Sequence, residues 1–486
     1  MKNLILLGLL FICPIFSIFA QTNEFEQSYE EFRKVAMDEY NSFRRQANEE
    51  YANWMRDAWE KHTALPIIPK PKGENLPPIQ FDKENSKPPK DNPIPIEIVP
   101  MPIINPQPLP IEPIREVPDP SPSVCQFQFY GLVCKIRFNE SQKFSLSSLC
   151  NESIAAQWNI MSDKIYDNTI RDCLEYRITH NLCDWAYIQF LDKLATSALS
   201  SKSEQNLLIA FLLSQTGYKI RLAKSENILY FLYASPHYLY ELPTFKIDND
   251  FYYGYNCTET KLEIFNMAFP NEQLMSFWIP KAQQLGNKLS ENRIISSQRY
   301  PEIKVSVNVN TDLIEFFNTY PTSVIDDNVM TRWAMYANTP ISSNLFETIY
   351  PQLRKHFNKC GQLEALNKLL NLVQTGFVYE YDDKVWGCDR AFFSEETLYY
   401  PYCDCEDRSI LYSRLVRDLL GLDVILVFYP GHLATAVAVT ENVSGDYILF
   451  DNKKFIITDP TYIGAPVGMT MPKMDNKTAK IILLNK

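Results

Sequence analysis

A cysteine, a histidine and an aspartate near the end of the chain have the residue types of a nucleophilic triad. Cys405 precedes apolar residues that recur at helical spacing as far as Gly421, which is typical of a helix stop. His432 opens an apolar stretch typical of a buried strand, and Asp459 directly follows another such stretch, residues 454–458. The pattern predicts a thiol at a helix start, with an imidazole and a carboxylate at the ends of two strands.

This set of groups supports thiol chemistry on a carbonyl carbon. A helix N-terminus favours an anion, so the pattern predicts that the thiolate of Cys405 is stabilised near neutral pH. His432 would take and return the proton, and Asp459 would orient the imidazole and stabilise its cation. Glu406 and Asp407 suit the first turn of a helix, although their negative charge would oppose thiolate formation.

The three residues stand in ordered motifs that resemble the transglutaminase-like superfamily of papain-like fold, in particular its bacterial cysteine-protease-like members. The family pattern is Gly-Asp-Cys-Glu-Asp before a helix, Gly-His at a strand start and Asp-Pro-Thr after another strand. Residues 404–407, 431–432 and 459–461 match it in order, and the lead-in at 372–387 is also similar. The resemblance covers about residues 350–475.

The resemblance implies an α+β fold in which a helix packs on an antiparallel sheet and carries a Cys405, His432 and Asp459 triad that acts on an amide. It also implies that the backbone N–H of Cys405 is one oxyanion donor, and it nominates the Gln374 side chain as the other. Cys403 stands where the family has glycine, so Cys403 is an alternative reactive sulfur. The chemistry needs no cofactor, and no cysteine or histidine spacing suits a metal site.

Three functions fit these residues. Hydrolysis of a peptide or protein substrate is preferred because water is the simplest acceptor for the acyl group. The same triad would serve a protein-glutamine acyltransferase that cross-links its substrates. In the third alternative, the papain-like domain is an inert scaffold of a secreted binding or assembly protein.

Composition limits the partners and the compartment. The first 20 residues have a basic start, an apolar run and a small residue at the end, which predicts a signal peptide and a secreted or periplasmic protein. The net charge is −11 and no basic run is present, which argues against nucleic acid and anionic membrane partners. No later stretch is apolar enough for a membrane span.

Residues 21–62 predict a long amphipathic helix. Aromatic residues and alanines repeat every 11 residues between 25 and 58, so one apolar stripe runs nearly straight along the helix. Either this helix 25–58 docks on a protein partner or self-associates, or it packs on the catalytic domain of its own chain.

Residues 63–124 predict a proline-rich linker. The stretch 66–122 holds 18 of the 32 prolines. Proline at this density favours polyproline II over helix or sheet, so we expect a stiff spacer.

The rest of the chain is long enough for two domains. We expect a mixed α/β accessory domain at 125–340 and a transglutaminase-like catalytic domain at 341–486. Cys125 and Cys134 flank a predicted hairpin and are the first candidates for a disulfide.

Overall fold

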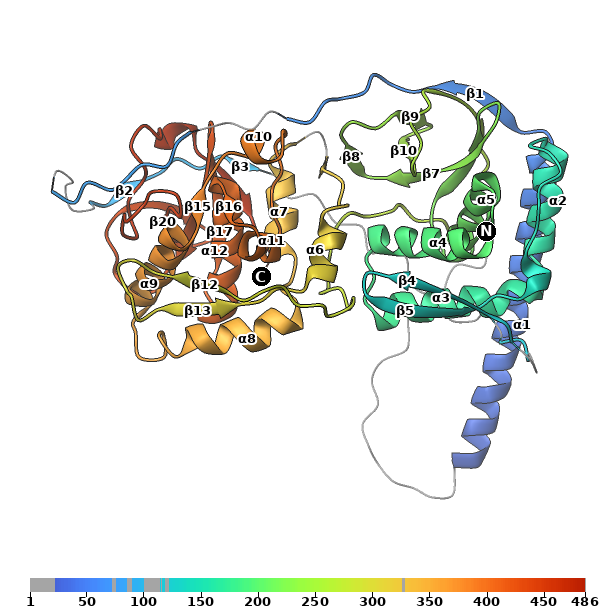
Figure 1. Ribbon diagram of the computed structural model, residues 1–486, viewed down its shortest axis with the longest axis horizontal. Helices are drawn as coiled ribbons and strands as arrows, with labels where there is room; N and C mark the ends of the chain where they lie inside the picture. Colours follow the sequence, from blue (N-terminus) through green and yellow to red (C-terminus); the bar gives the residue numbers. More distant parts are fainter. Residues whose placement is uncertain are drawn as a thin grey trace.

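The protein is a mixed α+β structure in which two mainly antiparallel sheets carry helices (Figure 1). The computed structural model describes residues 22–71, 76–84, 90–99, 114, 116–118, 122–325 and 328–485. The predicted signal peptide, residues 1–20, lies outside the described residues. Among the described helices, none combines the length and the apolar character that crossing a membrane requires.

The first half consists of a helical layer and a six-stranded sheet in the order β1-β11-β6-β7-β10-β9. The strands are β1 (Trp59–Thr63), β6 (Ile220–Lys224), β7 (Leu229–Ser235), β9 (Thr244–Ile247), β10 (Asp250–Gly254) and β11 (Lys261–Phe265). The helices are α2 (Asn151–Met161), α3 (Asp167–Thr179), α4 (Asp184–Ala198) and α5 (Lys202–Gln215). Helix α5 packs between α4 and β7, which is why its residues 203–215 are all buried.

The N-terminal helix packs on this half by its C-terminal part. Helix α1 (Thr22–Met55) lies against α2, and its first turns project beyond the body (Figure 1). Tyr51 is fully buried, whereas Trp54, also in the predicted stripe, is exposed. The buried face is shifted from the predicted stripe, and it includes Arg44, which pairs with the buried Asp167. The helix is also shorter than predicted, since residues 59–63 form the edge strand β1.

The second half is built on a seven-stranded sheet in the order β2-β19-β20-β18-β17-β21-β3. The strands are β2 (Asn92–Pro93), β3 (Ile98–Val99), β17 (Val424–Tyr429), β18 (His432–Ala438), β19 (Asp446–Phe450), β20 (Lys453–Thr458) and β21 (Lys480–Leu483). Helix α12 (Cys405–Leu420) packs on β17 and β18, and α9 (Gln362–Gly376) packs on α12. Gly421 ends α12 at φ +64°, a conformation that glycine adopts without strain.

The proline-rich segment is not a free spacer where the structure describes it, so this prediction was wrong. Strand β2 pairs with β19 and β3 pairs with β21, which places this segment at both edges of the sheet. Proline is tolerated at a sheet edge because only some residues of an edge strand must donate a backbone hydrogen bond to the neighbouring strand. The residues between the prolines supply those donors, as where the N–H of Ile94 bonds the carbonyl of Tyr447 at 2.8 Å.

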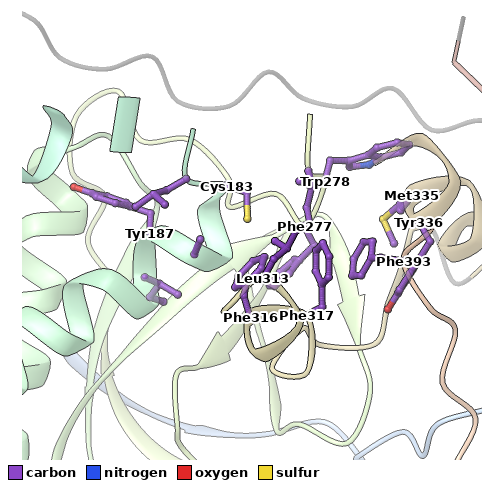
Figure 2. Packing of buried hydrophobic residues seen from close by; sticks show 14 of the residues in the cluster. Cys183, Tyr187, Phe277, Trp278, Leu313, Phe316, Phe317, Met335, Tyr336 and Phe393 are labelled. Carbon is purple, nitrogen blue, oxygen red and sulfur yellow. The ribbon is translucent and has the colours of Figure 1, made fainter. Parts of the chain in front are cut away.

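The two halves share buried residues. In Figure 2, side chains from α6 (Thr311–Phe317) and from α7 (Thr331–Asn338) meet around Phe393, whereas Tyr187 of α4 lies at the other end of the same buried cluster. The rings of Phe317 and Tyr336 stack on Phe393 with centroids 4.1 and 4.3 Å apart. Helix α7 also packs on α12, so it joins the first half to the second.

The predicted hairpin is present, but its disulfide is not. Strands β4 (Val124–Phe129) and β5 (Leu132–Arg137) pair with Cys125 opposite Ile136 and Cys134 opposite Phe127. Both cysteines are free, because this register displaces them from one another along the hairpin.

The remaining elements are short or connect the two halves. They are β8 (His237–Leu239), β12 (Arg293–Ser296), β13 (Lys304–Val307), β14 (Ser323–Ile325), α8 (Ser343–Arg354), β15 (Val378–Tyr379), α10 (Asp382–Val385), α11 (Ser394–Tyr399) and β16 (Tyr402–Cys403).

Candidate active site

The sheet register brings His432 and Asp459 together. Strands β18 and β20 are antiparallel with Thr435 opposite Thr458, so the start of β18 lies beside the residues that follow β20. The Nε2 atom of His432 is 2.9 Å from Oδ2 of Asp459, and both side chains are buried. Because the carboxylate accepts, Nε2 carries the proton and Nδ1 is left as the acceptor of the neutral imidazole.

Asp459 is held in place by the turn that follows it. Its Oδ1 atom accepts hydrogen bonds from the backbone N–H groups of Thr461 at 2.8 Å and Tyr462 at 3.1 Å. Only Oδ2 therefore faces His432, and the imidazole ring has one preferred orientation.

Cys405 and His432 line one cavity of about 100 Å³. The sulfur lies at the start of α12 and receives a hydrogen bond from the backbone N–H of Leu433, the residue after His432. Nδ1 of His432 is buried and has no hydrogen-bond partner among the described residues. Nδ1 of His432 is therefore free to accept a proton from the thiol of Cys405, with which His432 shares the cavity.

The thiol is not activated in this state, contrary to the expectation from the helix N-terminus. Burial, followed by the charges of Glu406 and Asp404, raises the pKa of Cys405 well above its usual range. The sulfur lies 3.2 Å from Oε2 of Glu406. The helix dipole corresponds to about half a charge, which is too little to offset two adjacent carboxylates and the loss of water.

Gln374 has a different place from the one predicted. Its side-chain amide donates to the backbone carbonyls of Asp459 at 3.0 Å, Tyr462 at 2.8 Å and Ala465 at 3.1 Å. Its Oε1 accepts from the N–H of Gly464 at 3.1 Å. The amide hydrogens are therefore committed to the loop that carries Asp459, and Gln374 positions this loop instead of donating to an oxyanion.

Trp333 is one of the cavity residues that the sequence did not single out. It lies on α7, lines the same cavity as Cys405 and stacks on Phe428 with ring centroids 5.5 Å apart. Its indole Nε1–H is buried without a hydrogen-bond partner among the described residues. Trp333 lies before the stretch that resembles the family, and no local pattern distinguishes it from a core tryptophan.

Cys403 points to a different neighbour. Nε of Arg408 donates to its sulfur at 3.5 Å, and Cys403 is not among the residues that line the cavity. Of the two candidate sulfurs, only Cys405 shares the cavity with His432.

Five buried carboxylates gather behind the cysteine. They are Asp382, Asp389, Asp404, Glu406 and Asp407, in groups whose oxygen atoms lie within 4.8 Å of one another. Arg332 forms an ion pair with Asp389 and lies 3.9 Å from Glu406. Burial and the neighbouring carboxylates raise the pKa of Asp382 to about 8.

This cluster has the donor atoms for a hard cation. Carboxylate oxygens are the main ligands of Ca²⁺ and Mg²⁺, whereas structural zinc sites are built mainly from cysteine sulfur and histidine nitrogen. Burial and the neighbouring carboxylates also raise the pKa values of Asp389, Asp404 and Asp407.

No protein-family model, curated protein or solved structure matches the chain.

Proposed function

We propose that the protein is a thiol-dependent amide hydrolase, a peptidase or amidase, whose second half has a papain-like, transglutaminase-like layout. The observation that carries the proposal is the shared cavity of Cys405 and His432, with Nε2 of His432 bonded to Asp459. The mixed α+β architecture, with α12 on an antiparallel sheet, is compatible with this layout.

The reaction begins with a neutral thiol and a neutral imidazole, because the pKa of Cys405 is raised. Nδ1 of His432 takes the thiol proton as the sulfur attacks the carbonyl carbon. Asp459 stabilises the imidazolium that forms. His432 then returns the proton to the leaving amine, and water hydrolyses the resulting thioester.

The developing oxyanion needs donors that face the cavity. The backbone N–H of Cys405 at the helix start is one candidate. The indole N–H of Trp333 is the other, because it is buried, unpaired and part of the cavity wall. In this proposal, Trp333 takes the role that the sequence suggested for Gln374.

The proposed hydrolase activity can be tested by comparing the new amino termini that the wild type and its variants produce in protein substrates. The full chain is incubated with a protein mixture, and newly formed N-termini are tagged and identified by mass spectrometry. We expect them with the wild type and with Cys403→Ala, and we expect none with Cys405→Ala. Activity that is lost in Cys403→Ala and retained in Cys405→Ala would show that the other sulfur reacts.

The same reactions distinguish the alternative functions. With a biotinylated primary amine present, an acyltransferase would attach the amine to glutamine side chains and produce few new termini. A binding or assembly protein with an inert site would give neither product in any variant.

A further inference from the structure

An extended segment, residues 65–71, crosses from the first half of the molecule toward the candidate active site. We call it the strap. On the first half, the N–H of Leu65 donates to the carbonyl of Thr244, and the N–H of Glu241 donates to the carbonyl of Ile68, both at 2.8 Å. The strap is extended but belongs to no named strand, and it carries prolines that restrict φ at 66, 69 and 71.

The chain is also attached on the far side of the site. The hydroxyl of Tyr379 donates to the carbonyl of Leu76 at 3.2 Å, and the N–H of Phe81 donates to the carbonyl of Ile463 at 2.9 Å. The same stretch of chain is therefore bonded to both halves.

The end of the strap forms part of the wall around the nucleophile. Pro71 lines the cavity of Cys405 and His432, and among the lining residues it is the one that comes from the proline-rich segment. Cys405 is 5% exposed and His432 is 2% exposed. The cavity of about 100 Å³ is well below the roughly 300–1,000 Å³ of sites that hold small ligands.

A peptide cannot react in this closed arrangement. Its carbonyl carbon must come within about 3–3.5 Å of the sulfur, and the flanking residues of the peptide need space at the mouth of the cavity. One wall must therefore move for a substrate to enter.

The strap is held near the cavity by exposed side chains and by weak polar contacts. Its Ile67 side chain is exposed, and so are Leu65 and Ile68. Near the cavity, Lys70 Nζ lies 3.4 Å from a carboxylate oxygen of the exposed Glu241 and 3.9 Å from the sulfur of Cys388. Ion pairs of this kind stabilise by only about 0–1 kcal/mol. The opposite walls, Trp333 and Phe428, are stacked on each other.

We infer that the strap inhibits this site by closing its mouth with Pro71, and that the substrate is an extended polypeptide segment that takes the place of the strap. The substrate class rests on the proposed function, whereas the closure rests on the geometry alone. An extended segment is favoured because the strap itself passes the mouth in that form, without a helix or a regular strand.

Alkylation of Cys405 measures the closure without any substrate. The full chain is treated with iodoacetamide at one pH, and the modification of the Cys405 peptide is followed by mass spectrometry. We expect Lys70→Ala to accelerate the labelling roughly two- to fivefold, which corresponds to the loss of one such ion pair. We expect the double variant Lys70→Ala, Pro71→Gly to accelerate it about tenfold or more, since tenfold corresponds to only about 1.4 kcal/mol of closure free energy.

Ile67→Ala is the matched control, because it shortens an exposed side chain of the same strap. It should label at the wild-type rate, and equal melting temperatures should show that all variants are folded. A synthetic peptide of residues 63–71, added to the double variant, should slow the labelling again. Unchanged labelling in the Lys70 and Pro71 variants, or equal acceleration by Ile67→Ala, would overturn the inhibitory role.

Turnover measured on the same samples separates the two proposals. Faster labelling with no new N-termini from any variant supports the closure and refutes the hydrolase. New N-termini at equal rates, together with equal labelling, support the hydrolase and refute the closure.

Discussion

Glu406→Gln should turn the candidate nucleophile into a more acidic thiol. The Glu406 carboxylate lies 3.2 Å from the Cys405 sulfur, and after burial its charge is the largest cause of the raised thiol pKa. Glutamine keeps the shape of the side chain but removes this charge. The substitution therefore tests whether the acidic neighbours hold the site in its inactive protonation state.

The size of the effect follows from the distance. Two unit charges about 4 Å apart interact by about 4 kcal/mol at an effective dielectric constant of about 20. Since one pKa unit is about 1.4 kcal/mol, the pKa of Cys405 should fall by up to about three units. The pKa of Cys405 should still lie above that of a thiol in water, because burial and the charge of Asp404 continue to raise it.

Ultraviolet absorbance of the thiolate measures this pKa without requiring access to the sulfur. Each protein is titrated with base, and the titration of the corresponding Cys405→Ala protein is subtracted, which cancels the tyrosines and the other cysteines. Glu263→Gln is the control, because this carboxylate lies on β11 and is partly exposed. An unchanged or higher thiol pKa in Glu406→Gln would refute the reasoning and leave burial as the cause.

Three further predictions concern the residues around the thiol. His432→Ala should abolish turnover. Asp459→Asn should lower kcat/KM by about 10²–10⁴, because an amide nitrogen facing Nε2 of His432 would favour the tautomer with its proton on Nδ1. A kcat/KM within threefold of wild type in Asp459→Asn would exclude the orienting role of Asp459. Gln374→Leu should destabilise the fold by roughly 2–5 kcal/mol in urea unfolding, since it leaves several buried carbonyls unpaired; an unchanged midpoint would contradict this. The pKa of Asp382 in the folded protein is raised to about 8, so its stabilising contribution is present at acid pH and is lost as the pH rises from about 4 to about 8. Asp382→Asn should remove this part of the pH dependence of the unfolding free energy, measured by unfolding curves across that range. If the unfolding free energy depends on pH as in the wild type, the dependence belongs to the other carboxylates.

The local elements that carry the candidate site could be predicted from the sequence. Helical spacing before Gly421 predicted α12, and apolar runs predicted β18 and β20. These features depend on residues close together in the chain, such as a glycine that ends a helix at positive φ. The motif order also selected His432 and Asp459, which the sheet register then brings to 2.9 Å.

The fate of the N-terminal region depended on contacts between distant residues. A stripe of aromatic residues predicts an amphipathic helix but not the surface that covers it, and the observed contact buries a face that includes Arg44, paired with Asp167. Proline density likewise predicts an extended chain, but whether that chain stays free depends on an available sheet edge. Strands β19 and β21 supply those edges more than 350 residues after β2 and β3.

The chemistry of the site was decided by tertiary structure in the same way. The sequence by itself determined that a cysteine begins a helix between acidic residues, but the balance between the helix dipole and the carboxylates depends on burial, which only the fold sets. Gln374 was assigned to the oxyanion by position, whereas the carbonyls it binds come from residues 459–465. Trp333 and Pro71 reach the cavity from outside the stretch that carries the motifs, because a cavity is enclosed by residues that meet in space and not along the chain.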